Sequence, residues 1–236
     1  RYELLKLRRQ TYHLLGEREP EMADLAEMEQ IAKSSGDLYR RAEVTIECVH
    51  TFHITGAYEQ AASLSAEGLK LAEEAGDIPL QAQALLHRGN ATMFLGDFDD
   101  ARGYLEQALE LADSVQARRV QMEAVRALGV IAEEQGDFST QQYRYHQALD
   151  IARELGDRLG ERRALNSLGV ATQARCDFKA SAQYFADSLI IARAIGDRAG
   201  EGVVLGNLGV QANLLGKYDR ARSLFEESIK VARDIN

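Results

Sequence analysis

The sequence is poor in residues that interrupt or crosslink a fold: its 236 residues include two prolines, two cysteines and no tryptophan. Because proline breaks helices, its scarcity favours a nearly all-helical chain. Cys48 and Cys176 lie too far apart to suggest a disulfide framework, which indicates a reducing compartment. No apolar run approaches the roughly 20 residues of a membrane span, and no signal peptide opens the chain. We therefore expect a cytoplasmic location and no membrane insertion.

Positive charge and catalytic motifs are also scarce. The 28 lysines and arginines are outnumbered by 37 acidic residues, and the net charge of −9 argues against nucleic-acid binding. The sequence has no GxxxxGK[ST] phosphate loop, no GxSxG elbow and no HExxH or CxxC spacing. Glu133 and Glu134 are adjacent, so they point in different directions around a helix and form no opposed acid–base pair. These absences predict that the chain is not an enzyme and holds no cofactor and no metal.

A strict period of forty residues runs through the chain. Alanine occupies one phase in all six repeats, and two further phases hold glycine in most of them. The alanines are Ala32, Ala72, Ala112, Ala152, Ala192 and Ala232, and the two glycine phases run Gly16, Gly56, Gly96, Gly136, Cys176, Gly216 and Gly36, Gly76, Gln116, Gly156, Gly196, Asn236. Such a period indicates a solenoid, in which each repeat packs only on its neighbours.

Each repeat contains two helical patterns separated by short breaks. In the fifth repeat the first pattern predicts a helix over about 159–175, because its apolar residues recur at the spacing of one helix face. The second pattern predicts a helix over about 178–195, with Ala182, Phe185, Ser188, Leu189 and Ala192 on one face. Gly-Asp pairs such as 76–77 and 196–197 form the breaks. Glycine supplies the left-handed residue after one helix, and aspartate caps the next.

The predicted fold class is all-α: a solenoid of about six antiparallel helix pairs. We expect one domain over 1–236, with repeats at about 1–36, 37–76, 77–116, 117–156, 157–196 and 197–236. The first repeat is degenerate, because Arg18 replaces the aromatic residue found at Tyr58, Phe98, Phe138, Phe178 and Tyr218. The chain opens without methionine and closes in mid-pattern, so we expect it to be part of a longer protein. Bare apolar faces at its two ends predict end-to-end self-association at high concentration.

A second pattern recurs within the repeats. The fifth repeat contains Leu165, Leu168-Gly169, Thr172, Asp177-Phe178, Ser181, Phe185 and Ser188, and the sixth contains Leu205, Leu208-Gly209, Tyr218, Ala221, Phe225 and Ser228. This pattern resembles the tetratricopeptide repeat (TPR), and the resemblance implies a right-handed superhelical solenoid. The usual period of this family is 34, so the repeat here is a long variant. The phrases GDRLGERRALNSLGV and GDRAGEGVVLGNLGV resemble two groups of TPR proteins: the sensor arm of bacterial STAND-type signal-transduction ATPases, and the Pins-type scaffolds of cell polarity.

The resemblance implies a non-catalytic recognition module for signal transduction, most similar to the STAND sensor arm. The alternative is a stand-alone Pins-like adaptor that joins two proteins, and a third class is an enzyme subunit whose chemistry lies outside these residues. In this family the first helix of each pair lines a concave groove that binds a peptide, a protein or a small effector. The matching groove positions are His50, His53, Asn90, Arg126, Glu133, Glu134, Arg163, Asn166, Gln173, Asn207 and Asn213. The competing interpretation is that these residues only form solvated helix faces.

Histidines gather in the first helices near the N-terminal end. His50 and His53 are three residues apart and therefore neighbours on one helix face. A metal site would need three or four suitable ligands, and no such spacing is present. A pH-responsive contact is the other interpretation, because histidine titrates near neutrality.

Overall fold

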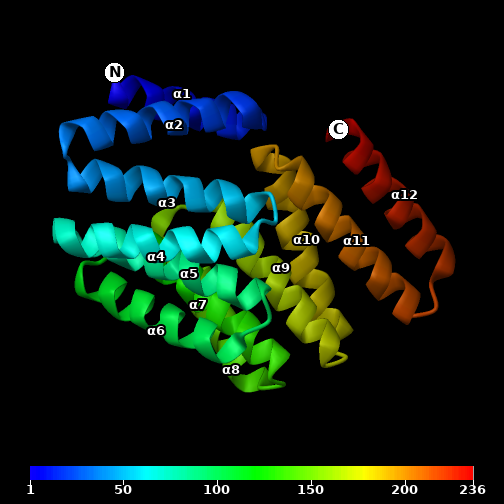
Figure 1. Ribbon diagram of the computed structural model, residues 1–236. Coiled ribbons are helices and arrows are strands. Elements are labelled where there is room, and N and C mark those ends of the chain that lie inside the picture. The colour runs from blue at the N-terminus through cyan, green and yellow to red at the C-terminus, as the bar shows by residue number, and fades with distance from the viewer. Residues whose placement is uncertain (236) are drawn as a thin grey trace. The chain divides into compact units, whose positions relative to one another are not determined.

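The computed structural model describes residues 1–235, which form twelve helices without a strand in that range (Figure 1). The helices alternate in direction along the chain and are joined by turns of two or three residues. They are α1 (Tyr2–Leu15), α2 (Arg18–Ser35), α3 (Leu38–Ile54), α4 (Tyr58–Ala75), α5 (Ile78–Phe94), α6 (Phe98–Ser114), α7 (Arg118–Glu134), α8 (Phe138–Leu155), α9 (Arg158–Ala174), α10 (Phe178–Ile195), α11 (Arg198–Leu214) and α12 (Tyr218–Ile235). The all-α solenoid fold class is confirmed.

The helix ends have the chemistry that the Gly-Asp pairs predict. The carboxylate of Asp77 accepts a hydrogen bond from the backbone N–H of Leu80 at 2.8 Å, and that of Asp197 accepts one from Gly200 at 2.8 Å. These bonds satisfy backbone donors that a helix leaves free at its first turn. Gly76, which ends α4, has a φ of 69° in the left-handed region. The repeated pair therefore fixes where each helix stops and the next begins.

The chain divides into two compact units, Arg1–Ala124 and Val125–Asn236, called unit 1 and unit 2 below. In unit 1, helices that follow one another in sequence pack together from α1 to α6. In unit 2 the same holds from α8 to α12. The interpretation of residues 1–236 as one domain of six repeats stays a prediction.

Glycines bring the two helices of a pair close together. The ideal Cβ position at Gly169 on α9 lies 2.5 Å from Cδ1 of Phe185 on α10. Gly209 on α11 stands against Phe225 on α12 in the same way, with its Cβ position 2.7 Å from Cε1. No real Cβ fits at such distances, so the aromatic ring occupies the space that a side chain would take.

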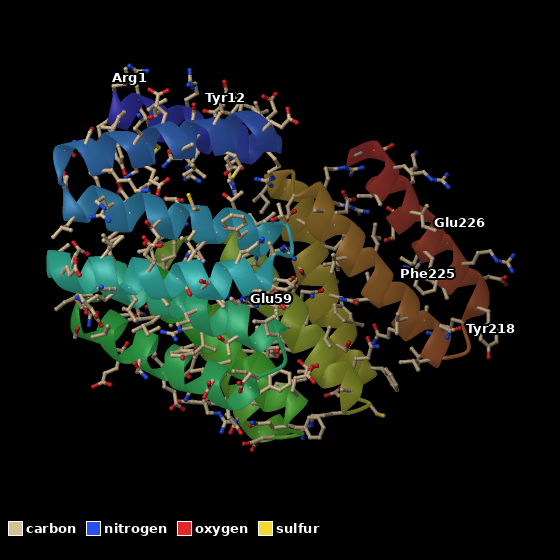
Figure 2. The ribbon with its side chains drawn as sticks, viewed as in Figure 1. Arg1, Tyr12, Glu59, Tyr218, Phe225 and Glu226 are labelled. Carbon is tan, nitrogen blue, oxygen red and sulfur yellow. The ribbon has the colours of Figure 1, made fainter. Side chains whose placement is uncertain are left out.

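Several side chains lie elsewhere than the helical pattern suggested. Ala182 was predicted on the buried face of α10, and this is wrong, because it is exposed. Ser181 takes the buried place instead and donates a hydrogen bond to the backbone oxygen of Gly169 at 2.8 Å. Figure 2 shows Phe225 on the last helix, α12. Phe225 is 37% exposed, whereas Phe185, its equivalent in the preceding repeat, is fully buried. The described part of the chain offers no further helix to cover that face.

Neither cysteine forms a disulfide. Cys48 is half-buried on α3, and burial raises the pKa of its thiol to about 12. Cys176 is exposed in the turn between α9 and α10. Among residues 1–235, no helix is long and apolar enough to cross a membrane.

Candidate functional site

The first helices of the pairs lie side by side in unit 1 and share one polar face, which we call the first-helix face of unit 1. Its side chains come from α1, α3 and α5. Lys6 Nζ lies 2.7 Å from Glu43 Oε1, and Arg9 Nη2 lies 2.9 Å from Glu47 Oε2, so two ion pairs connect α1 to α3. Rings of His13, His50 and His87 continue the row, with centroids 5.0 and 5.8 Å apart. Ion pairs and ring contacts therefore connect each first helix of unit 1 to the next across this face.

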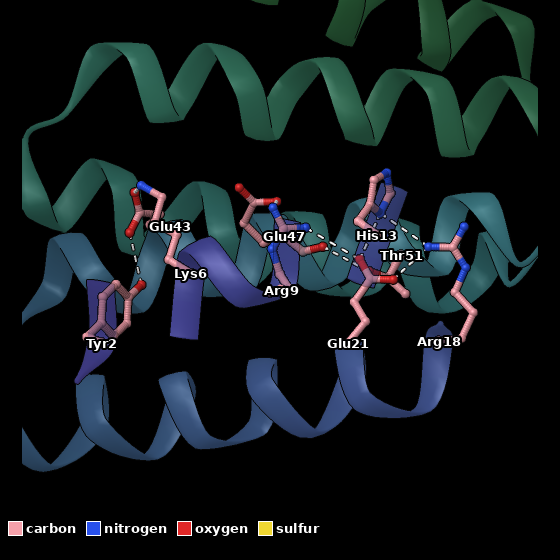
Figure 3. A network of polar contacts seen from close by, with 9 residues as sticks. All are labelled: Tyr2, Lys6, Arg9, His13, Arg18, Glu21, Glu43, Glu47 and Thr51. Carbon is pink, nitrogen blue, oxygen red and sulfur yellow. Dashed lines mark hydrogen bonds and ion pairs between the residues drawn. The ribbon is translucent and has the colours of Figure 1, made fainter. Parts of the chain in front are cut away.

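A buried carboxylate anchors this face at its N-terminal end (Figure 3). Glu21 on α2 is fully buried and accepts hydrogen bonds from Arg18 Nη1 at 2.6 Å and from His13 Nδ1 at 2.8 Å. Arg9, itself 5% exposed, lies 3.5 Å from the same carboxylate. Burial alone would raise the pKa of Glu21, but the hydrogen bonds from Arg18 and His13 outweigh it and hold the pKa below its usual value. The network ties α1, α2 and α3 together.

Two histidines of this row, His50 and His87, are uncharged at neutral pH. Burial lowers the pKa of His50 to about 4, and electrostatic interactions with His13 and Arg9 add to that effect. Burial likewise lowers the pKa of His87 to about 3, with contributions from His50 and His53. A neutral imidazole both donates and accepts hydrogen bonds. These rings therefore offer polar recognition without a fixed charge.

An aromatic cluster lies at the C-terminal ends of α3 and α5. The rings of Tyr58 and Phe94 are stacked with centroids 4.6 Å apart, and His53 meets both of them edge-on at 5.4 and 5.0 Å. Phe94 is 53% exposed. Nearby in sequence, the side-chain oxygen of Asn90 is buried without a hydrogen-bond donor among the described residues. The last turns of α3 and α5 in unit 1 thus carry aromatic rings together with the imidazole of His53 and the amide of Asn90.

Unit 2 presents a different set of groups on its own first-helix face, which comes from α9, α11 and the part of α7 after residue 124. Asn207 Nδ2 donates a hydrogen bond to Asn166 Oδ1 at 2.9 Å, so the two amides form a pair across α9 and α11. Each amide keeps further donor or acceptor capacity, because an asparagine side chain offers two N–H groups and two oxygen lone pairs. The pair is half-buried.

Three arginines accompany the amide pair. Arg162 is 8% exposed, and its Nε lies 3.0 Å from Asp197 Oδ2. Burial lowers the pKa of Arg162, Asp197 opposes that effect, and the positive charges of Arg163 and Arg126 lower the pKa further. Arg163 is exposed and Arg126 half-buried.

Glu133 is positioned by a buried phenol. Tyr145 on α8 is 1% exposed, and its hydroxyl donates a hydrogen bond to Glu133 Oε2 at 3.1 Å. Burial and the neighbouring Glu133 raise the pKa of the Tyr145 hydroxyl well above its usual value. The phenol therefore stays protonated and holds the carboxylate on α7.

Two family models match the sequence, both described as the tetratricopeptide repeat, over residues 164–234 and 82–114. These residues include the glycine–aromatic contacts and the Asn166–Asn207 pair described above. Over these residues the chain consists of tetratricopeptide repeats. No curated protein matches its sequence significantly.

Solved structures share the fold of this TPR protein at low sequence identity. A Rap protein complexed with Competence and Sporulation Factor is 16% identical, with a TM-score of 0.78, over 99% of this chain and 64% of its own. NprR in complex with its cognate peptide NprX is 15% identical, with a TM-score of 0.72, over 99% and 69%. A STAND protein with a tetratricopeptide repeat sensor from Pyrococcus horikoshii is 15% identical, with a TM-score of 0.68, over 98% of this chain and 36% of its own.

None of the eleven groove positions predicted from the TPR resemblance is fully buried. Glu134, Arg163 and Asn213 are exposed, and the other eight are half-buried. The structure brings His50 beside His13 and His87, His53 beside Phe94, and Asn166 beside Asn207. Three apolar residues of the same first helices, Ile46, Leu86 and Met93, are buried. The role of the eleven residues in binding stays a prediction.

Sequence reasoning about this TPR protein missed the groups that hold the face in place. Glu21 and Tyr145 occupy positions where other repeats have small or apolar residues, such as Ala61 and Phe185. A comparison of residues at the same phase would have found both. Among the described residues, no three or more His, Cys, Asp or Glu side chains are grouped to hold a metal ion.

Proposed function

We propose that this TPR protein is a non-catalytic recognition module whose first-helix faces bind a peptide or a peptide-like segment of a protein. The observation that carries the proposal is the Asn166–Asn207 amide pair, because it sits between adjacent first helices beside Arg163 and keeps hydrogen-bonding capacity for a partner. Amide side chains suit the alternating N–H and C=O groups of an extended peptide backbone.

Two structures of similar fold support a peptide as the ligand. One is a Rap protein complexed with Competence and Sporulation Factor. The other is NprR in complex with its cognate peptide NprX. The chemistry of the faces is consistent with this class of ligand, since unit 1 offers neutral imidazoles and aromatic rings while unit 2 offers amides and arginines. We infer that unit 2 fixes the backbone and any acidic group of the ligand.

The binding proposal is tested with peptides selected from a random display library on the purified chain. Asn166→Ala with Asn207→Ala should weaken binding of the selected peptides at least tenfold, because two half-buried amide contacts are lost at about 1 kcal/mol each. Arg126→Glu with Arg163→Glu should abolish binding of the acidic ones. Gln183→Ala, an exposed amide on α10, is the matched control. Unchanged affinity in both double variants, with melting preserved, would place the binding site elsewhere.

We further propose that the module is the cytoplasmic sensor arm of a bacterial STAND-type ATPase, where ligand binding controls a nucleotide switch. The fold it shares with the Pyrococcus horikoshii sensor supports this, and the chain spans 36% of that protein. The gene sequence around the segment that encodes this chain provides the test. A phosphate-loop motif in the same reading frame supports the ATPase, whereas further repeats alone support the stand-alone adaptor.

A further inference from the structure

An open groove lies on unit 1 among α4, α5 and α6, separate from the first-helix face. Its volume is about 230 Å³, more than ten times the roughly 10–15 Å³ that one water molecule needs. Three leucines, Leu69, Leu85 and Leu111, supply its apolar lining. Its polar lining consists of Glu73, Gln81, Gln107 and Glu110. The groove thus combines an apolar surface with two carboxylates.

The forty-residue period provides a template for what fits there, because unit 2 repeats the same positions 120 residues later. The apolar positions remain apolar, as Leu189, Leu205 and Val231. In unit 2 the place of Glu73 is taken by Arg193, whose guanidinium bridges two carboxylates. Its Nε donates to Glu201 Oε1 on α11 at 2.7 Å, and its Nη2 donates to Glu227 Oε1 on α12 at 2.8 Å. An arginine side chain therefore spans the corresponding three helices.

Unit 1 lacks that arginine, and every polar position around it differs. Gln81 and Gln107 stand where unit 2 has Glu201 and Glu227, and Glu110 stands where unit 2 has Lys230. The four polar positions carry no net charge in unit 2 but two negative charges in unit 1. Neither Glu73 nor Glu110 has an ion-pair partner among the described residues. The groove of unit 1 therefore carries carboxylates and no cation, whereas the equivalent positions of unit 2 include the cation of Arg193.

We propose that this groove takes up an arginine side chain from a basic segment of a partner protein. The aliphatic part of the side chain lies over the leucines, and the guanidinium lies between the carboxylates of Glu73 and Glu110. Arginine suits the site because its planar group carries a fixed charge and several donors, as Arg193 does within unit 2. This surface goes beyond the proposed function, since its two residues on α5, Gln81 and Leu85, lie on another side of that helix than His87 and Asn90.

The probe is a blocked Leu-Arg-Leu tripeptide, titrated into methyl-labelled protein and followed by NMR. We expect the methyl signals of Leu69, Leu85 and Leu111 to shift, with the shifts reduced at high salt because the partly exposed charges are screened. The counterpart with citrulline keeps the shape of arginine without its charge and should bind at least tenfold more weakly. Equal shifts with the two peptides, or shifts confined to other methyl groups, would overturn the proposal.

The decisive variant transfers the arrangement of unit 2 into unit 1 by Glu73→Arg with Gln81→Glu and Gln107→Glu. The new arginine should occupy the groove, so the tripeptide should no longer shift the three leucines. Far-UV circular dichroism should show that the transfer variant folds unchanged. Undiminished binding of the tripeptide by this variant would contradict the proposal.

A second variant, Glu73→Gln with Glu110→Gln, leaves the groove open but removes both negative charges. It should bind the tripeptide at least tenfold more weakly. Asn207→Ala should leave this binding unchanged, which separates it from failure of the peptide-binding proposal.

Discussion

At the scale of single residues, two side chains occupy backbone conformations that suit glycine. Cys176 has a φ of 61° at a turn position where five other repeats have glycine, and Gln116 has a φ of 55° at the second glycine phase. A left-handed conformation costs a residue with a Cβ about 1–2 kcal/mol. Cys176→Gly should therefore raise the free energy of unfolding by about 0.5–1 kcal/mol, since glycine's greater freedom in the unfolded chain offsets part of the gain.

Chemical denaturation of the purified variants measures this gain. Gln116→Gly serves as a graded comparison, because the amide of Gln116 donates a hydrogen bond to the backbone oxygen of Asp113 at 3.0 Å. Losing that bond should reduce the gain below that of Cys176→Gly. Gly216→Ala, with φ at 70° and open space around its Cβ position, should lose stability by a similar amount. A destabilised Cys176→Gly would mean that the thiol has stabilising contacts.

At the scale of helix pairs, contact between a glycine and an aromatic ring sets how closely two helices approach. A Cβ on Gly169 would lie 2.5 Å from the ring of Phe185, which is fully buried. Gly169→Ala should therefore cost about 1–3 kcal/mol by overpacking, and Gly169→Leu should cost more. Thermal or urea unfolding provides the measurement.

Gly103 on α6 is the matched control for this prediction. It is also helical, but nothing lies within 4 Å of its Cβ position. Gly103→Ala should stabilise the protein by about 0.5–1 kcal/mol, because alanine favours the helix. If both substitutions were stabilising, the close approach of α9 and α10 would be unimportant for stability.

At the scale of the whole chain, the repeat period predicted most of the fold. The second helix of the fifth repeat was expected at 178–195 and lies at Phe178–Ile195, because glycine and aspartate mark its ends chemically. Side-chain direction was less predictable: Ala182 and Ser181 are both small, so only packing against Gly169 shows which is buried. The acidic groove was not predicted because its polar residues are ordinary on a helix surface. The difference in charge is recognised only when Glu73 is compared with Arg193 at the equivalent position of unit 2.

The uneven distribution of histidine predicts that acid weakens the two units unequally. Unit 1 contains His13, His50, His53 and His87, whereas unit 2 contains only His146. The folded-state pKa values of His50 and His87, about 4 and 3, lie below the unfolded value near 6.5. Their neutral forms therefore favour folding fully above pH 6.5. Stability is lost as the pH falls from 6.5 toward these values, because only the unfolded chain then binds the protons.

Between pH 7 and pH 5 this effect should lower the stability of unit 1 by about 1–2 kcal/mol per histidine. Hydrogen exchange, corrected for its intrinsic pH dependence, should show lost protection in α1–α6 and little change in α8–α12. Burial raises the pKa of Glu47, so protonation of this carboxylate stabilises the folded state as the pH falls and opposes the effect of the histidines. A variant is therefore needed to separate the contribution of the histidines. His50→Asn with His87→Asn introduces residues found at the same phase, Asn90 and Asn207, and should remove the difference between the units. Equal loss in both units of the unmodified protein would show that desolvation of the histidine row does not control its acid stability.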